Sequence, residues 1–304
     1  MKNSDSTVAF LGIGAHKSAT TWLAHVMRAH EQLWIPLAKE IHYFDRATHY
    51  DSPNTLNSSR FLERIGSKKP ENRHWRKSAC RDFLSSIARM DFQRFKWNFN
   101  YYTGTINDDW YLRLFPENSS RLCGEITPAY SMLNVEDIRR INALLPNVKV
   151  IYLLRDPIDR AWSHLRYDQG SGEKLNLDKF SELKKYIDSP TLTRRGDYVS
   201  TLRDWTSVIS SDRIFVGFYD DIKSRPNYFL EHLSSFLNID HNLFPQQEVK
   251  TNILVSQKRK IPEEVELYLA KKYLNDLEYL ADTLGEHTVK WHQRAATILS
   301  RSNQ

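Results

Sequence analysis

The stretch "HKSATTWL", residues 16–23, gathers side chains that suit the binding of a phosphate or a similar anion. Lys17 offers a mobile positive charge, and Ser18, Thr20 and Thr21 offer short hydroxyl donors that can reach phosphate oxygens. This clustering of one cation and three hydroxyls within five positions predicts an anion-binding loop.

The elements on either side of the loop are expected to position it. The apolar run "VAFLGIG", residues 8–14, predicts a buried strand. The segment Thr20 to His30 predicts a helix whose apolar face is formed by Trp22, Leu23, Val26 and Met27, with Thr20 or Thr21 as its N-cap. The unpaired N–H groups of the first helical turn would then point into the loop, with the positive end of the helix dipole behind them.

A nucleoside triphosphatase or nucleotide kinase is the obvious alternative for such a loop. Its motif G-x-x-x-x-G-K-[ST], aligned on Lys17, requires glycine at two positions where this chain has Leu11 and His16. The mismatch disfavours that class, which stays as an alternative hypothesis.

A second segment, "VIYLLRDPIDRAWSHL" at residues 150–165, repeats the design. A strand ends at Arg155, Pro157 suits the first turn of a helix, and Ser163 follows about two turns later. A guanidinium can grip two oxygens of a phosphate while a hydroxyl binds a third. Two anion sites at the ends of neighbouring strands predict a ligand that carries phosphate at both ends.

The wider pattern predicts an α/β fold with a parallel sheet of about five strands flanked by helices. Strands without strict alternation are expected at 8–14, 121–126, 148–154 and 213–219. Helices are expected at 20–30, 135–144, 158–168, 198–209, 227–237 and 263–284. We expect one domain over residues 1–304, with a largely helical insertion at about 51–108 whose aromatic and basic residues either pack on the core or form the wall of a substrate cleft.

The amino-acid composition limits the classes of ligand that this protein is expected to bind. The 304 residues carry a net charge of +6, which favours an anionic ligand and leaves nucleic-acid binding as a further alternative. The two cysteines form no C-x-x-C pair, so neither a disulfide framework nor a thiolate zinc site is indicated. Because there is no targeting segment and no apolar run long enough to span a membrane, we expect a soluble, cytoplasmic protein.

The two anion-binding segments resemble the cofactor motifs of sulfotransferases that use 3′-phosphoadenosine 5′-phosphosulfate (PAPS). In that family a K-S-G-T-T-W-L loop holds the 5′-phosphosulfate, and an R-D-P…R…S segment holds the 3′-phosphate. The resemblance implies a P-loop-like sulfotransferase fold, no metal, and a cofactor site made of His16, Lys17, Ser18, Ala19, Thr20, Thr21, Trp22, Arg155, Ser163 and Arg259. Ala19 stands where the family usually has glycine, so the backbone is expected to avoid positive φ there.

The segment "LAKEIHYFDR", residues 37–46, resembles the K-E-x-H-F-F-D segment of glycosaminoglycan sulfotransferases, especially the heparan sulfate 3-O- and N-sulfotransferases. This resemblance implies that Glu40 is the catalytic base, with His42 as the alternative base and Asp45 as a supporting, substrate-side residue. Lys17 would stabilise charge on the leaving phosphate. An ion pair between Lys39 and Glu40 is not favoured, since adjacent residues of an extended segment point apart.

The segment "GEITPAYSM", residues 124–132, resembles the family's E-K-T-P-A-Y segment, which implies that Glu125, Thr127 and Tyr130 bind the acceptor. Ile126 replaces the family lysine, so a less acidic hydroxyl acceptor is expected, on a glycan, a glycolipid or another carbohydrate-like molecule. Near the C-terminus, "SQKRKIP" at residues 256–262 partly resembles the loop that closes over the cofactor. The sequence predicts neither the acceptor's identity nor the oligomeric state.

Overall fold

A computed structural model describes residues 8–50, 58–68, 70–117, 119–171, 175–251 and 259–301. Its strands are β1 Phe10–Gly14, β2 Leu33–Trp34, β3 Leu122–Ile126, β4 Lys149–Leu154 and β5 Ile214–Phe218. In the described part of the chain they form one parallel sheet of order β2-β3-β1-β4-β5. The predicted fold class and four of these strands are confirmed, while the two-residue strand β2 is too short to give a sequence signal.

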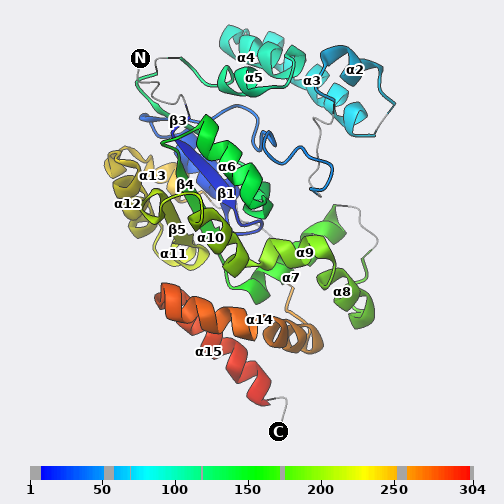
Figure 1. The fold of residues 1–304 in the computed structure, drawn as a ribbon, viewed down its shortest axis with the longest axis vertical. Helices are drawn as coiled ribbons and strands as arrows, with labels where there is room; N and C mark the ends of the chain where they lie inside the picture. Colours follow the sequence, from blue (N-terminus) through cyan, green and yellow to red (C-terminus); the bar gives the residue numbers. More distant parts are fainter. Residues whose placement is uncertain are drawn as a thin grey trace.

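Helices cover both faces of the sheet and both ends of the molecule (Figure 1). Before β3 the chain forms α1 Thr20–Arg28, α2 Phe61–Gly66, α3 Pro70–Ala88, α4 Phe92–Thr103 and α5 Asp108–Leu112. From β3 to β5 it forms α6 Val135–Leu144, α7 Pro157–Gly170, α8 Phe180–Ile187, α9 Pro190–Gly196 and α10 Tyr198–Thr206. After β5 it forms α11 Tyr219–Ser224, α12 Pro226–Leu237, α13 Gln246–Val249, α14 Glu263–Leu284 and α15 Glu286–Arg301.

The hydrophobic core consists of two clusters, one on each face of the sheet, because successive side chains of a strand point to opposite faces. On β4, Val150, Tyr152 and Leu154 belong to a cluster with the large helices on one face, and Ile151 and Leu153 belong to a second cluster with α1 and α12. The predicted apolar face of α1 is fully buried in that second cluster. Burial on both faces is what parallel strands require, and it fixes the direction in which each strand ends.

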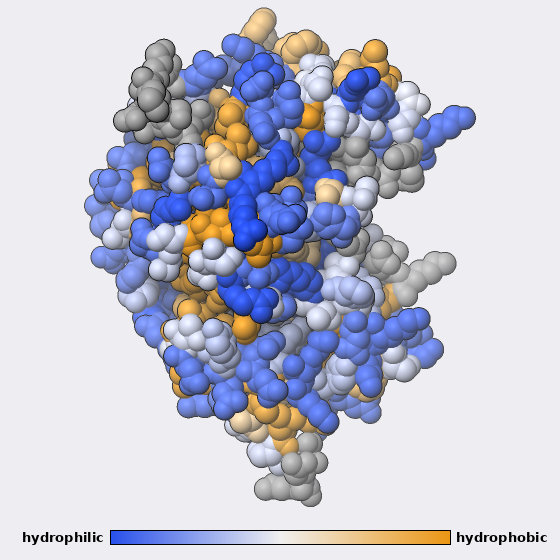
Figure 2. Space-filling model, viewed as in Figure 1, coloured by the Kyte–Doolittle hydropathy of each residue, from blue (hydrophilic) through white to orange (hydrophobic). Residues whose placement is uncertain are grey.

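The insertion lies between β2 and β3 at one end of the molecule, while α14 and α15 lie at the opposite end (Figure 1). Its described residues form α2 to α5, so this region is largely helical as expected. Figure 2 shows a mostly hydrophilic face, with apolar side chains exposed at the insertion end.

The parallel register places three chain segments at one edge of the sheet. Gly12 lies beside Ile126 of β3 and Ile151 of β4, so β1, β3 and β4 deliver the loops that begin at 15, 127 and 155 to the same place. Ligands of open α/β sheets bind at this carboxyl edge.

The backbone of the loop after β1 differs from the expected one in two respects. Ala19, and not Thr20 or Thr21, is the N-cap of α1, and no side chain caps this helix end. Ala19 also has φ of 67°, in the left-handed region that the sequence analysis expected it to avoid. The loop therefore keeps the conformation that suits glycine and accepts the steric penalty of a methyl group.

Ala19→Gly should therefore leave the free energy of unfolding unchanged or raise it by up to about 1 kcal/mol, because relief of about 1–2 kcal/mol of left-handed strain offsets the extra freedom of the unfolded chain. Denaturant unfolding measures the change. Ala296→Gly on the exposed face of α15 is the control and should lower stability by about 1 kcal/mol. Equal losses in both variants would contradict strain at Ala19.

Candidate active site

The loop after β1 forms the wall of a cavity of about 420 Å³ at the carboxyl edge of the sheet. His16, Lys17, Ala19, Thr20 and Thr21 line it, as predicted for the first anion site. Because no side chain caps α1, the N–H groups of its first turn are available to a bound anion. Two residues predicted for this loop are not part of this lining: the Ser18 side chain is fully buried, and Trp22 lines a neighbouring cavity instead.

The segment after β4 enters the same cavity. Arg155 and Ser163 both line it, and a guanidinium nitrogen of Arg155 donates to the backbone oxygen of Lys17 over 3.1 Å. The Nε atom of Arg155 is buried without a partner among the described residues. The two predicted anion-binding segments thus face one another across a single cavity.

Lys17 is held close to the opposite wall. Its ammonium lies 3.9 Å from the centre of the Tyr167 ring of α7. Burial, together with the nearby Arg155, lowers its pKa to about 8. Lys17 is therefore largely protonated at neutral pH, and an anion beside it would raise its pKa again.

Glu40, His42 and Asp45 form a chain of hydrogen-bonded groups beside the loop. The carboxylate of Glu40 lies 3.5 Å from Nε2 of His42, whose Nδ1 lies 2.7 Å from Asp45. Glu40 and His42 both have positive φ, which turns the two side chains toward one another across Ile41. Glu40 and His42 line the cavity, whereas Asp45 is fully buried and orients the imidazole from behind.

Hydrogen bonds and charges around Glu40 and His42 shift the pKa of each residue in the direction opposite to the effect of burial. Burial would raise the pKa of Glu40, but hydrogen bonds from His42 and Lys39 outweigh it and lower the pKa to about 2. Burial would lower the pKa of His42, but hydrogen bonds to Asp45 and Glu40 raise it to about 9. At neutral pH the pair is therefore a carboxylate beside an imidazolium, so Glu40 is the group with a free lone pair.

Lys39 makes the contact that the sequence analysis considered unfavourable. Its ammonium lies 2.6 Å from Glu40 and donates to the hydroxyl of Thr21 over 2.9 Å. The expectation failed because residue 40 is not extended: with φ of 64° the chain turns, and neighbouring side chains no longer point apart. Lys39 thereby connects the candidate base to the first turn of α1.

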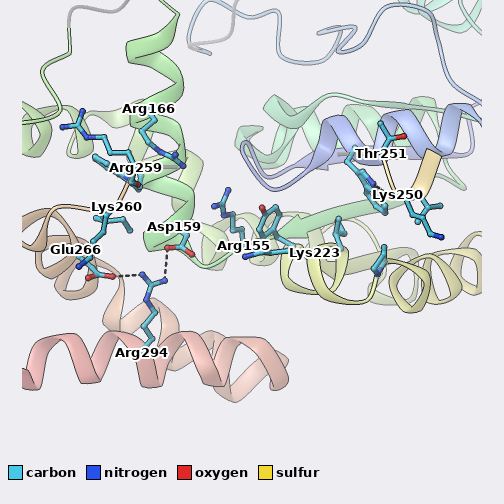
Figure 3. A pocket seen from close by; sticks show the side chains of 17 residues that line it. Arg155, Asp159, Arg166, Lys223, Lys250, Thr251, Arg259, Lys260, Glu266 and Arg294 are labelled. Carbon is cyan, nitrogen blue, oxygen red and sulfur yellow. Dashed lines mark hydrogen bonds and ion pairs between the residues drawn. The ribbon is translucent and has the colours of Figure 1, made fainter. Parts of the chain in front are cut away.

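Figure 3 shows a larger cavity of about 930 Å³ beside the first one. Arg155 and Tyr219 line both cavities. Its basic side chains come from six separate parts of the chain: Arg155, Arg166, Lys223, Lys250, Arg259, Lys260 and Arg294. Its two acidic residues, Asp159 and Glu266, are both paired with Arg294, at 2.9 and 2.7 Å. The cavity is therefore strongly positive.

Apolar residues complete that cavity. Trp22, Ile222, Pro226 and Val249 line it, and the indole N–H of Trp22 donates to the backbone oxygen of Val249 over 3.2 Å. Arg259 of the predicted loop at 256–262 lines it and pairs with Asp178, while residues 256–258 of that loop lie outside the described residues. Lys223 and Lys250 were missed, because an isolated surface lysine gives no signal in the sequence.

Comparisons with known proteins show the family to which the chain belongs. A sequence profile described as the sulfotransferase family matches residues 10–242. The chain belongs to the sulfotransferase family. A sulfotransferase from Alicyclobacillus acidocaldarius has the same fold, with a TM-score of 0.63 and 18% identity over 93% of this chain and 98% of that one.

Curated relatives of this sulfotransferase-family chain include two different kinds of protein. The human bifunctional heparan sulfate N-deacetylase/N-sulfotransferase 2 is 27% identical over 153 residues, which cover 46% of this chain and 17% of that protein. The membrane-associated sulfotransferase kil1 of Dictyostelium discoideum is 24% identical, over 64% of this chain and 59% of that protein. The chain thus spans only part of each. None of its described helices is long and apolar enough to cross a membrane.

The residues expected to bind the acceptor are instead buried behind the site. Glu125, Thr127, Tyr130 and Asp45 are at most 1% exposed, and none lines the cavity. Glu125 accepts hydrogen bonds from the hydroxyls of Thr127, Tyr130 and Tyr111, at 2.7 to 3.0 Å. The prediction that they contact the acceptor does not match this burial: the side chains of Glu125, Thr127 and Tyr130 lie beneath the 40–45 segment, whereas Pro128 of the same segment lines the cavity.

This buried network supports the segment that carries Glu40. The backbone N–H groups of Ile41 and Tyr43 donate to Glu125 and to the hydroxyl of Tyr130, at 3.4 and 3.0 Å. Burial raises the pKa of Glu125, but the hydrogen bonds that it accepts favour its ionised form. In this sulfotransferase-family chain, the buried residues after β3 therefore hold residues 40–45 in place, while Pro128 of the same segment lines the cavity.

Tyr130→Phe should lower the free energy of unfolding by about 1–3 kcal/mol, because it removes one donor to buried Glu125 and leaves the N–H of Tyr43 without its acceptor. Chemical denaturation measures this loss. Tyr279→Phe, at an exposed tyrosine of α14, is the matched control and should change stability by less than about 0.5 kcal/mol. Equal stability of the two variants would mean that the network does not hold the segment.

Proposed function

We propose that this chain transfers a sulfuryl group from PAPS to a hydroxyl of a carbohydrate or glycan-like acceptor. The observation that supports it most strongly is the position of Glu40, which lines both the cavity of the anion-binding loop and a neighbouring cavity of about 480 Å³. A hydroxyl that reaches Glu40 from the neighbouring cavity would meet an anion held at the N-terminus of α1.

The described residues fit a nucleotide with phosphates at both ends. The buried, unpartnered Nε atom of Arg155 and the lining position of Ser163 suit one phosphate, and the first turn of α1 with Lys17 suits the other. Trp22 and its apolar neighbours in the larger cavity offer a surface for the adenine ring of the nucleotide. The sulfuryl group supplied by this nucleotide moves to the acceptor oxygen as its bond to the 5′-phosphate oxygen breaks.

The chain's own residues perform three tasks in this transfer. Glu40 accepts the proton of the acceptor hydroxyl, while His42 and Asp45 hold the carboxylate in place. Lys17 and the N–H groups of α1 stabilise the electron pair that stays on the leaving phosphate oxygen. An anion bound beside Thr21 would also compete with Glu40 for Lys39, which would raise the pKa of Glu40 and make it a stronger base.

Glu40→Gln should lower the rate of transfer by about 10²-fold or more while leaving nucleotide affinity nearly unchanged, because the amide cannot accept the proton. Single-turnover assays with radiolabelled PAPS and a panel of hydroxyl acceptors measure the rate, and calorimetry measures binding. Full activity of the variant would contradict the role of Glu40 and would indicate that His42 is the base.

The pH profile separates the two candidate bases without a mutation. With Glu40 as base, kcat/KM should already be full at neutral pH and should fall as Lys17 loses its proton near its pKa of about 8. With His42 as base, kcat/KM should instead rise from neutral pH to a maximum between the pKa of Lys17, about 8, and that of His42, about 9. A rising limb between neutrality and that pH would exclude Glu40.

Lys17→Ala should weaken binding of 3′-phosphoadenosine 5′-phosphate by about tenfold or more, because a charge-assisted contact is lost from a partly buried site. Isothermal titration calorimetry gives the affinity directly. Lys290→Ala, which removes the same charge from the exposed face of α15, is the control and should bind like the wild type. Equal affinities for the two variants would count against the loop as the phosphate site.

A further inference from the structure

The C-terminal hairpin of α14 and α15 contributes Glu266 and Arg294 to the wall of the larger cavity, although it lies outside residues 10–242, which match the family profile. The guanidinium of Arg294 contacts three carboxylates, those of Asp156 and Asp159 on one side, at 2.7 and 2.9 Å, and that of Glu266 at 2.7 Å. Figure 3 shows the side chain of Arg294 reaching from its helix toward Asp159 and Glu266. One cation of the hairpin therefore compensates acidic residues of both α7 and α14.

The hairpin is packed against the elements that surround this cavity. The ring of Trp291 in α15 lies on Phe218 of β5, with ring centres 5.7 Å apart. Nε2 of His287 lies 2.8 Å from the carboxylate of Asp221 in α11. Since Trp291, His287 and Asp221 are all buried, α15 has a fixed position, and Arg294 enters the cavity from a rigid support.

Asp159 lies on the same face of α7 as residues that are suited to bind a phosphate. It precedes Ser163 by four residues and Arg166 by seven, a spacing that places side chains on one face of a helix. Asp159 and Arg166 line the larger cavity, and Ser163 lines the first one. Arg155, just before the helix, lines both. A carboxylate is thus built into the wall that carries the candidate phosphate site.

Without compensation, these carboxylates would repel a phosphate bound at that wall. Asp156 cannot turn away, because its carboxylate caps α7 by accepting from the N–H of Ile158 over 2.9 Å. Burial raises the pKa of Asp156 to about 6, and Arg294 opposes this rise. Loss of Arg294 would therefore favour a proton on Asp156 and leave Asp159 and Glu266 as uncompensated negative charges.

Arg294 itself has little capacity left to hold a phosphate. Its Nη1 atom donates to Asp156 and Asp159, and its Nη2 atom donates to Glu266. A guanidinium binds a phosphate best through two parallel N–H donors, and both terminal nitrogens are already engaged with carboxylates. Its effect on a nucleotide therefore acts through the acidic residues that it binds.

We propose that Arg294 is a positioning residue for the 3′-phosphate of the nucleotide: it holds and neutralises Asp159 and Glu266, so that the phosphate site at Arg155 and Ser163 prefers nucleotides that carry a 3′-phosphate. This inference rests on the proposed function, which places one phosphate of the nucleotide at Arg155 and Ser163. It adds the C-terminal hairpin to the parts of the chain that select the donor.

Calorimetry with two nucleotides tests the proposal, because 3′-phosphoadenosine 5′-phosphate and adenosine 5′-phosphate differ only in the 3′-phosphate. Arg294→Gln should bind the bisphosphate about tenfold more weakly, an effect limited by the partial exposure of Asp159 and Glu266 to water. Its affinity for adenosine 5′-phosphate should change by less than about threefold, since the repulsion acts on the 3′-phosphate. Arg294→Lys keeps the positive charge and should keep part of the preference.

A combined variant separates charge compensation from a structural role. Arg294→Gln together with Asp159→Asn and Glu266→Gln removes the cation and both carboxylates, and should recover the preference for the bisphosphate to within about threefold of wild type. Arg301→Gln, which removes a guanidinium from the exposed last turn of α15, is the control and should bind both nucleotides like wild type. If Arg294→Gln alone fails to fold, the combined variant still decides.

Three results would overturn the role of Arg294: an unchanged preference in Arg294→Gln, an equal loss of affinity for both nucleotides, or a combined variant that stays weak for the bisphosphate alone. Each of them would leave the proposed function standing if wild type binds 3′-phosphoadenosine 5′-phosphate. Failure of wild type to bind that nucleotide would refute the proposed function itself, and with it this inference.

Discussion

The candidate site depends on one constraint, which is that three parallel strands end at the same edge of the sheet. The register of β3, β1 and β4 brings Thr127, the loop after Gly14 and Arg155 together. The pairing of the strands, and not contacts within the loops, is therefore what places these segments side by side. Each loop then adds what its own sequence allows: an uncapped helix with a lysine, a guanidinium, or a buried carboxylate. Because the strands are buried on both faces, this convergence is as stable as the core.

The electrostatics of the site follow from this convergence. Positive groups gather where an anion would bind, and Glu40 is kept ionised because His42 and Lys39 compensate its charge. This compensation stabilises the ionised form of Glu40 but limits its strength in the proposed role of base, since a carboxylate with a pKa of about 2 has little affinity for a proton. Lys39, which also contacts Thr21, links the strength of the base to the occupation of the loop.

Local pattern was enough to predict the parts of the site that lie at strand ends. Lys17, Arg155 and Ser163 could be located because a buried strand, a loop and an amphipathic helix leave a clear signal in the sequence. The side chains that depend on tertiary packing could not: Lys223 and Lys250 enter the large cavity from distant segments, and Glu125 turns inward because β3 passes beneath residues 40–45. Positive φ at Ala19 and Glu40 was equally hidden, because neither residue type favours it.

The two ends of the site place different demands on the fold. The nucleotide end uses backbone N–H groups and side chains fixed by the sheet, so its geometry cannot change without disturbing the core. The cavity on the other side of Glu40 is lined by residues of α3 and α4, two helices that also leave Leu84, Ile87 and Phe99 exposed. Exposed residues of these two helices can therefore change at little cost to stability, since surface substitutions seldom exceed about 0.5 kcal/mol. Under the proposed function, donor binding is therefore tied to the edge of the sheet, whereas exposed residues of the insertion can change without disturbing that edge.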